Sequence, residues 1–593
     1  MKRRWSVLYN IILKWRVHHI NESNFVLILS IVVGIVTGLV AFSLKSAIFY
    51  THEFLVNRLE INTGNVLFFL LPLIGIWLTH LFIKYYVKDD LGHGVTKVLH
   101  SISRQNSIIK PHNNYTSMIA TTFTIGFGGS VGTEATIVLT GSSIGSNLAR
   151  FFRMNYKVMT LMVGCGAAGA ISGIFKAPIT GVFFTLEILL LDLTMASLIP
   201  LILTAMTSYV VSFMLLGKSL SLSFPIINDV VITNIPYYLI LGIICGVGSI
   251  YFIRANLKIE DLIKSIKNQN LRILIGGSIL GILIFIFPSL FGEGYEVLKE
   301  LVNGNTDILT ANSYFFEYRS VPLFLIVYSL SIVLIKVIAT ALTNGSGGVG
   351  GTFAPCLFMG GMLGFTMGSI VNYTGLIDLP VPYFILAGMA GVMSGVMSSP
   401  LTAMFLIAET SGGYQLLLPL MLVSVVSYLT VKRVEPHSIY ARRLAKQGEL
   451  LTHNKDKSIL TLMKLNRVIE TDFRVVHVDA TLGDLVKEVS LSSRNIFPVI
   501  NYEEALIGVV ILDDIRKIMF DHDLYNKTTV RDFMITPPVI VDIHDKMDVV
   551  MKYFEDTKVW NLPVTEDGKY KGFISKSKIF STYRRVLQHY SDE

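Results

Sequence analysis

The chain has 593 residues, of which 52% are hydrophobic and only 16% are charged. This composition excludes an ordinary soluble protein and predicts a polytopic membrane protein, because each spanning helix needs roughly 20 apolar residues with few charges. The net charge of +8 is explained by basic cytoplasmic loops more simply than by nucleic acid. The cysteines predict neither a disulfide framework nor a zinc site, because their number, three, is odd and no C-x-x-C occurs.

Residues 1–24 are basic and interrupted by polar side chains, which predicts an amphipathic cytoplasmic helix and not a cleaved signal peptide. Residues 25–450 carry the apolar segments of a transmembrane domain. The first set lies at 25–47, 66–87, 116–126, 133–150, 158–173, 178–192 and 194–216, and the second at 237–254, 272–291, 322–343, 353–371, 382–397, 400–410 and 414–431. Several are too short to cross a bilayer and stop near a proline or glycine, which predicts broken helices.

Two glycine-rich blocks repeat along this domain. TTFTIGFGGSVGTEATIVLTGSSIG at 121–145 matches TALTNGSGGVGGTFAPCLFMGGMLG at 340–364, and residues 169–187 match 391–409 at nearly the same offset. The predicted fold is therefore an all-α membrane domain of two inverted repeats, at about 25–216 and 237–431.

The glycine clusters let the backbone leave helical geometry and approach a ligand closely. Helices that start at Thr133 and Thr352 would present free N–H groups and the positive end of the helix dipole, so the expected ligand is an anion. Close packing of helices through small residues is the alternative interpretation.

The composition changes after Lys432. A linker is expected at 451–465, followed by an α/β region at 466–593 that repeats internally, at about 466–522 and 528–588. The repeat pairs Pro498 with Pro563 and Gly508 with Gly572. This region resembles a tandem pair of cystathionine-β-synthase (CBS) domains, which implies a cytoplasmic α/β tail.

With both halves in view, residues 25–450 resemble the CLC family of chloride channels and chloride/proton exchangers. The motifs that carry the resemblance are Gly92-His93-Gly94, Gly132-Thr133-Glu134-Ala135-Thr136, Gly351-Thr352-Phe353-Ala354-Pro355 and A-R-R-L-A-K-Q at 441–447. The resemblance implies that N–H groups of the first loop, of Thr352 and Phe353, and near Ala135 bind anions. It implies that Glu134 is the gating glutamate, which competes with the anion when ionised and yields when protonated. A glutamate that merely caps a helix start is the alternative.

Three positions depart from the family pattern. His93 stands where many members have a serine, and its imidazole either donates a hydrogen bond to the anion or points away. The central tyrosine of the family falls on Pro436, and Tyr440, one turn further on, is not expected to replace it, so the inner gate is expected to be wider or remade. Glu187 takes the first position of the exchangers' Glu pair and Ile188 the second, so the inner proton acceptor is missing.

The CBS motif that holds an adenine nucleotide is incomplete in both copies. The first copy keeps Asp514 but lacks the hydroxyl, and the second keeps Ser575 but has Lys578 in place of the acid. Binding of an adenine nucleotide and a purely structural, dimerising tail both remain open.

The leading functional hypothesis is chloride transport, as a chloride/proton antiporter gated by Glu134. A passive chloride channel and a fluoride transporter are the alternatives. A CBS-regulated divalent-metal transporter would need several ligands facing one path, but Glu134, Glu187, Asp192 and Glu409 are scattered. No hydrolase or P-loop motif occurs, so an enzyme is not expected. No cofactor is expected to be required, and the expected partners are chloride, protons, membrane lipid and, from the resemblance, a second copy of the chain.

Overall fold

The computed structural model describes residues 16, 18–55, 66–191, 194–217, 232–375, 377–412, 414–446, 465–545 and 547–582. It divides the chain into two compact units, Met1–Leu451 and Thr452–Glu593. The amphipathic helix predicted for residues 1–24 and the linker predicted for 451–465 lie largely outside the described residues.

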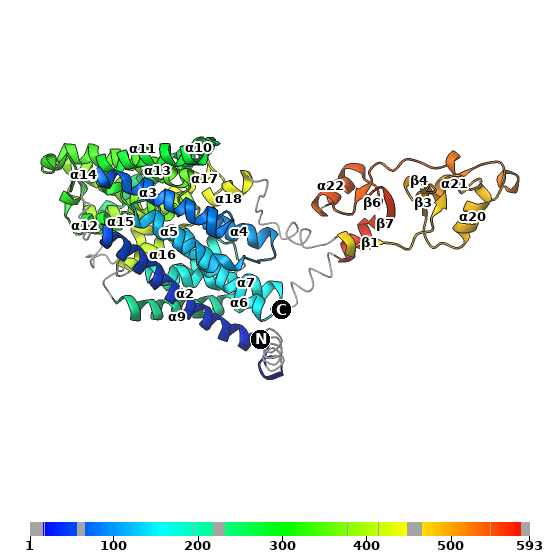
Figure 1. Cartoon of the computed structure of the whole chain (residues 1–593), viewed down its shortest axis with the longest axis horizontal. Helices are drawn as coiled ribbons and strands as arrows, with labels where there is room; N and C mark the ends of the chain where they lie inside the picture. Colours follow the sequence, from blue (N-terminus) through cyan, green and yellow to red (C-terminus); the bar gives the residue numbers. More distant parts are fainter. Residues whose placement is uncertain are drawn as a thin grey trace. The chain divides into compact units, whose positions relative to one another are not determined.

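The first unit is helical, and the apolar segments of both halves form its helices (Figure 1). The first half contains α2 (Glu22–Glu53), α3 (Val66–Phe82), α4 (Gly94–Arg104), α5 (Thr116–Gly126), α6 (Glu134–Phe151), α7 (Tyr156–Phe175), α8 (Pro178–Glu187) and α9 (Met195–Leu216). The second half contains α10 (Ile235–Lys264), α11 (Gln269–Ile286), α12 (Tyr295–Val302), α13 (Pro322–Ser346), α14 (Phe353–Tyr373), α15 (Val381–Met397), α16 (Pro400–Thr410) and α17 (Leu417–Lys432), followed by α18 (Ile439–Lys446). Helices α4 and α12 are short and amphipathic, which is why they were not among the predicted apolar segments.

The two halves are built on the same packing contacts. Helix α6 crosses α7 where Gly141 lies against the carbonyl group of Gly166, and α14 crosses α15 where Gly360 lies against the carbonyl group of Gly388. A Cβ atom at Gly141 or Gly360 would overlap the facing carbonyl oxygen, so only glycine permits these crossings. The same contact in both halves confirms the prediction of two homologous repeats.

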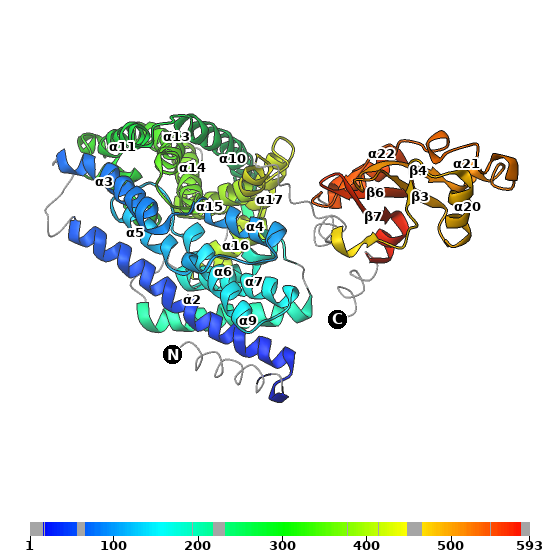
Figure 2. The ribbon, with the colours of Figure 1, turned by 45° about the vertical axis from the view of Figure 1, so that its right-hand side comes forward.

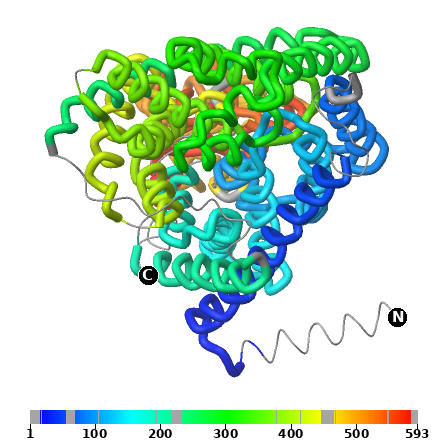
Figure 3. The backbone as a smooth tube through the Cα atoms, turned by 90° about the vertical axis from the view of Figure 1, so that its left-hand side faces the viewer, coloured from blue at the N-terminus to red at the C-terminus, as the bar shows by residue number. Residues whose placement is uncertain are grey.

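The helices of this unit differ in length. Among the described residues, nine helices are long and apolar enough to cross a membrane. Helices α5, α8 and α16 have 11, 10 and 11 residues, so each spans only about 15–17 Å of a hydrocarbon layer of about 30 Å. Figure 2 shows α2 and α9 along one side and α10, α11 and α13 along the other, with α6, α14, α15 and α16 between them. Figure 3 shows α2, in blue, running along the outside of this unit. Helices too short to cross the hydrocarbon layer therefore occur in both halves, as the sequence predicted.

The second unit contains two sheets of repeated design. The first has the order β2-β3-β4 and the second β1-β7-β6-β5. The elements are β1 (Ile469–Glu470), β2 (Val476–His477), α20 (Leu482–Ser490), β3 (Ile496–Ile500), β4 (Leu506–Ile511), α21 (Leu512–Ile515), β5 (Val541–Asp542), α22 (Met547–Thr557), β6 (Asn561–Glu566) and β7 (Lys569–Ser575). The hairpin registers correspond, with Val499 opposite Gly508 in β3–β4 and Val564 opposite Gly572 in β6–β7. This repetition confirms the tandem α/β pair predicted from the sequence.

Candidate functional site

The two glycine loops of the repeats are hydrogen-bonded to each other. The N–H of Gly132 donates to the carbonyl of Gly351 over 2.9 Å, and the N–H of Gly351 donates back over 2.7 Å. Thr133 and Thr352 are the N-cap residues of α6 and α14, so this bridge places the starts of the two helices side by side. Their positive dipole ends and their first N–H groups therefore meet in one place.

Glu134 lies at this meeting point. It is the first residue of α6 and is only 1% exposed. Its Oε1 accepts a hydrogen bond of 2.5 Å from the hydroxyl of Tyr295. The backbone N–H groups of Glu134 and Ala354 lie near the carboxylate, whereas its buried Oε2 makes no hydrogen bond of its own. A carboxylate thus occupies the position to which two helix starts would direct an anion.

The first glycine loop, Gly92–Gly94, packs directly against this position. Gly92 has φ +49°, which favours glycine, and α4 begins at Gly94, where a Cβ atom would overlap the carbonyl group of Ala135. The imidazole of His93 lies 2.6 Å from Oε1 of Glu260 on α10. The sequence left two orientations of the imidazole open. In the structure the imidazole bonds Glu260, so it points away from the anion position.

Glu260 holds three elements together. Besides His93, its carboxylate accepts from Arg443 of α18 over 2.9 Å and from Lys264 over 2.6 Å. Glu260 is itself buried, at 4% exposure. This cluster joins the first glycine loop to the helix that leads toward the tail.

Tyr440, and not Pro436, lies beside the start of α14. Pro436 is exposed in the turn before α18, whereas Tyr440 is only 3% exposed. The Tyr440 hydroxyl lies 3.9 Å from the sulfur of Met397 and close to the hydroxyl of Thr352 at the start of α14. This position of Tyr440 was not expected from the sequence, because residue spacing alone does not show which face of α18 packs against the domain.

Aromatic rings line the site. Phe353 is 1% exposed, and its ring stacks on Phe175 with centroids 5.4 Å apart. Phe175 also contacts the ring of Tyr295 edge-on at 6.3 Å. Ile188, at the end of α8, is buried. The ring of Tyr295, which bonds Glu134, and the rings of Phe175 and Phe353 packed on it place apolar surface beside the carboxylate, and this strengthens its electrostatic interactions.

Sequence reasoning missed three polar residues near Glu134. Glu293 accepts hydrogen bonds from the N–H and the hydroxyl of Thr133, at 2.9 and 2.7 Å. Tyr295 is the donor to Glu134, and Lys336 is fully buried in α13. Two signals could have found them: a lone lysine in a 25-residue apolar helix is a functional candidate, and Gly292-Glu293-Gly294-Tyr295 is a further glycine pair between helices.

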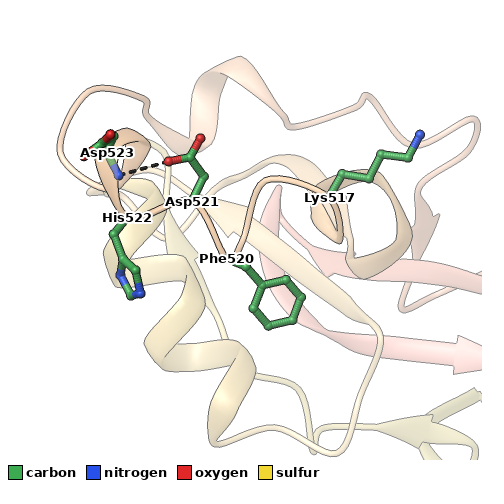
Figure 4. A pocket seen from close by; sticks show the side chains of 5 residues that line it. All are labelled: Lys517, Phe520, Asp521, His522 and Asp523. Carbon is green, nitrogen blue, oxygen red and sulfur yellow. Dashed lines mark hydrogen bonds between the residues drawn. The ribbon is translucent and has the colours of Figure 1, made fainter.

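The two tail residues considered for binding a nucleotide, Ser575 and Asp514, differ in their contacts. The hydroxyl of Ser575 donates to the carboxylate of Glu470 over 2.6 Å, and Glu470 also pairs with Arg494 at 2.8 Å. Asp514 is exposed after β4. A shallow hollow in the tail is lined by Lys517, Phe520, Asp521, His522 and Asp523 (Figure 4). Neither Ser575 nor Asp514 lines it.

A membrane domain in which paired helix starts surround one buried carboxylate belongs to the class of anion channels and anion-coupled transporters. The chain belongs to the voltage-gated chloride channel family, whose model matches residues 73–432. A CBS domain model matches residues 530–585.

Individual relatives agree with this assignment. The chain is 29% identical to a ClcB-like chloride channel protein of Ralstonia nicotianae over 387 residues, which is 64% of this chain and 86% of the relative. It is 24% identical to the H(+)/Cl(-) exchange transporter ClcA of Vibrio cholerae over 441 residues, which is 71% of this chain and 89% of the relative.

Solved structures show the same fold. A CLC-type fluoride/proton antiporter matches with a TM-score of 0.58 at 25% identity, over 70% of this chain and 97% of that one. A eukaryotic CLC transporter matches with a TM-score of 0.61 at 18% identity, over 93% of this chain and 97% of that one.

Proposed function

We propose that the protein transports chloride across the membrane in exchange for protons, with Glu134 as the group that both ions use. The observation that carries this proposal is the position of the Glu134 carboxylate at the joined starts of α6 and α14. Ionised, the carboxylate occupies the place of an anion. Protonated, it loses its charge and the attraction of the two helix dipoles, so chloride can take its place.

Burial supports the proton-binding role. The carboxylate is 1% exposed and lies among aromatic rings, where a lone charge is costly and the protonated form is accessible. The anion would be held by backbone N–H groups of Thr352, Phe353 and Ala135, with the loop of Gly92 and Gly94 packed against Ala135. Because His93 is engaged with Glu260, the N–H groups of this loop, not the imidazole, would face the anion.

A passive chloride channel is the alternative, since Ile188 provides no acid on the inner route. The two functions differ in one measurement. Purified protein in liposomes with a chloride gradient should move protons against their own gradient, and Glu134→Gln should keep chloride flux but abolish proton movement. If the wild-type protein dissipates the chloride gradient without moving protons, it is a channel. The assay is repeated with fluoride, because one structural neighbour is described as a fluoride/proton antiporter.

Divalent-metal transport is disfavoured by the acidic side chains themselves. Glu187 accepts from the N–H groups of Leu401 and Thr402, and Glu409 accepts from those of Ile179 and Thr180. Both carboxylates are therefore committed to helix starts. Asp192 lies outside the described residues.

The assembly and the tail complete the proposal. The resemblance supports a homodimer with one path per subunit. The short helices α8 and α16 carry half-exposed apolar side chains that a second copy could cover. The rings of Phe183 and Phe405 on these helices stack with centroids 4.8 Å apart.

The tail is proposed to be cytoplasmic. Binding of an adenine nucleotide would require Ser575 to exchange Glu470 for the nucleotide. Calorimetry with ATP and AMP tests this step, and absence of heat with both removes it.

A further inference from the structure

The segment Gly292–Tyr295 crosses the start of α6, and we name it the outer strap. Two of its side chains form hydrogen bonds with the N-cap and the first residue of α6. The carboxylate of Glu293 accepts from the N–H and hydroxyl of Thr133, and the hydroxyl of Tyr295 donates to Glu134. The outer strap thus contacts both the N-cap and the proposed gating side chain.

The outer strap is held in a fixed shape. Gly292 and Gly294 have φ angles of +61° and +87°, which favour glycine, and a Cβ atom at Gly294 would overlap the ring of Phe358. The ammonium of Lys336 donates to the carbonyl of Gly292 over 3.1 Å and to the hydroxyl of Ser130 over 2.8 Å. A buried cation of the second half therefore ties the outer strap to the glycine loop of the first half.

The phenol of Tyr295 and the carboxylate of Glu293 have opposite effects on Glu134. A hydrogen bond from Tyr295 stabilises the ionised carboxylate more than the protonated acid, because hydrogen bonds to charged groups are stronger. The nearby negative charge of Glu293 disfavours the ionised carboxylate. Among the residues that the structure describes, the other charged and titratable groups around this pair are Lys45 of α2, Lys176 after α7, Lys336 of α13, Cys356 of α14 and Tyr440 of α18.

We propose that the outer strap sets the pH at which Glu134 releases the anion position, with Tyr295 as a positioning residue that holds the carboxylate in place and Glu293 as the charge that opposes it. This inference rests on the proposed function for its physiological meaning. The contacts that carry it are the hydrogen bonds to Thr133 and Glu134, which do not depend on which anion is transported.

The test measures the protonation of Glu134 directly. Infrared difference spectra of the full-length protein in lipid are recorded across a pH range, and the carboxylic acid band that is absent from Glu134→Gln is assigned to Glu134. Tyr295→Phe, which removes one hydroxyl, should move the midpoint of this band to higher pH by roughly one unit. Glu293→Gln keeps an oxygen for Thr133 but loses the charge, and it should move the midpoint to lower pH.

The control is Tyr238→Phe, which removes the hydroxyl of a buried tyrosine whose ring stacks on Phe384 between α10 and α15, and it should leave the midpoint unchanged. The pH profile of chloride flux should shift with the band. An unshifted midpoint in Tyr295→Phe, or the same direction of shift in both outer-strap variants, overturns the inference. If Tyr295→Phe does not fold, a midpoint in Glu293→Gln that stays or rises overturns it. If the midpoints move as expected but the wild-type protein carries no chloride, the inference about the outer strap is supported and the proposed function is wrong.

Discussion

Glu187 and Glu409 form reciprocal helix caps. Glu187 of α8 caps the start of α16, and Glu409 of α16 caps the start of α8. Glu187, the last residue of α8, accepts from the N–H and hydroxyl of Thr402 at the start of α16, both over 2.7 Å. Glu409, near the end of α16, accepts from the N–H and hydroxyl of Thr180 at the start of α8, at 2.8 and 2.6 Å. The reciprocal contact joins the two halves by the same interaction used twice, as expected for a pseudo-two-fold arrangement.

Removing either cap should destabilise the membrane domain by a similar amount. Glu187→Ala and Glu409→Ala each leave the N–H groups of a half-buried helix start without an acceptor, so we expect a loss of about 2 kcal/mol in each case. Thermal unfolding in detergent measures the effect, and Glu317→Ala, at an exposed carboxylate, is the control. Strongly unequal losses would argue against the reciprocal arrangement.

Lys336 should be required for the position of the outer strap. Lys336→Met retains the length of the side chain but leaves the carbonyl of Gly292 and the hydroxyl of Ser130 without their donor. We expect a loss of about 1–3 kcal/mol in unfolding free energy and a change in the pH dependence of transport. Lys299→Met on α12, which removes an exposed lysine, should change neither quantity.

The first glycine loop should tolerate loss of the imidazole better than addition of a methyl group. His93→Gln removes a side chain that bonds Glu260, so chloride flux per folded protein should fall by no more than about fivefold, because the loss of one such bond is worth about 1 kcal/mol. Gly94→Ala places a Cβ atom into the carbonyl group of Ala135 and should reduce flux or folding much more. Radioactive chloride uptake into liposomes compares them, and a larger defect in His93→Gln would indicate that the imidazole faces the anion.

Tyr440 should close the inner side of the path. Tyr440→Ala removes a buried ring next to Thr352 and should raise chloride flux while weakening its coupling to protons. Tyr440→Phe, which keeps the ring, should retain most of the coupling. If both variants behave like the wild-type protein, Tyr440 has only a packing role.

The tail offers a prediction on acid stability. The hydroxyl of Thr481 donates to Asp484 within the cap of α20, and this bond lowers the pKa of Asp484. The carboxylate therefore stabilises the folded tail at neutral pH, and the contribution disappears as the pH falls through the lowered pKa. Thr481→Ala should lower the unfolding temperature of the tail at pH 7 more than at pH 3, as measured by circular dichroism. Equal effects at both pH values would show that the charge contributes nothing.

The repeats made much of this molecule predictable from its sequence. Matching glycine blocks indicated the two halves, and helices α6 and α14 begin at Glu134 and Phe353, within a residue or two of the predicted starts. These features are local, because glycine and proline fix the backbone where they occur.

Contacts between distant segments could not be predicted in the same way. The bond from Tyr295 to Glu134 joins residues 161 positions apart, and the engagement of His93 with Glu260 spans 167 positions. Neither pair shares a motif. The face that Tyr440 presents to Thr352 depends on how α18 docks against the domain, which residue spacing does not define.

The location of bound anion in crystals of Glu134→Gln soaked in bromide tests the central claim most directly. With the competing charge removed, anomalous scattering should show bromide between the first N–H groups of α6 and α14, next to Gln at position 134 and Phe353. Bromide bound elsewhere in the domain with nothing at these helix starts, or a cation in their place, would contradict the account.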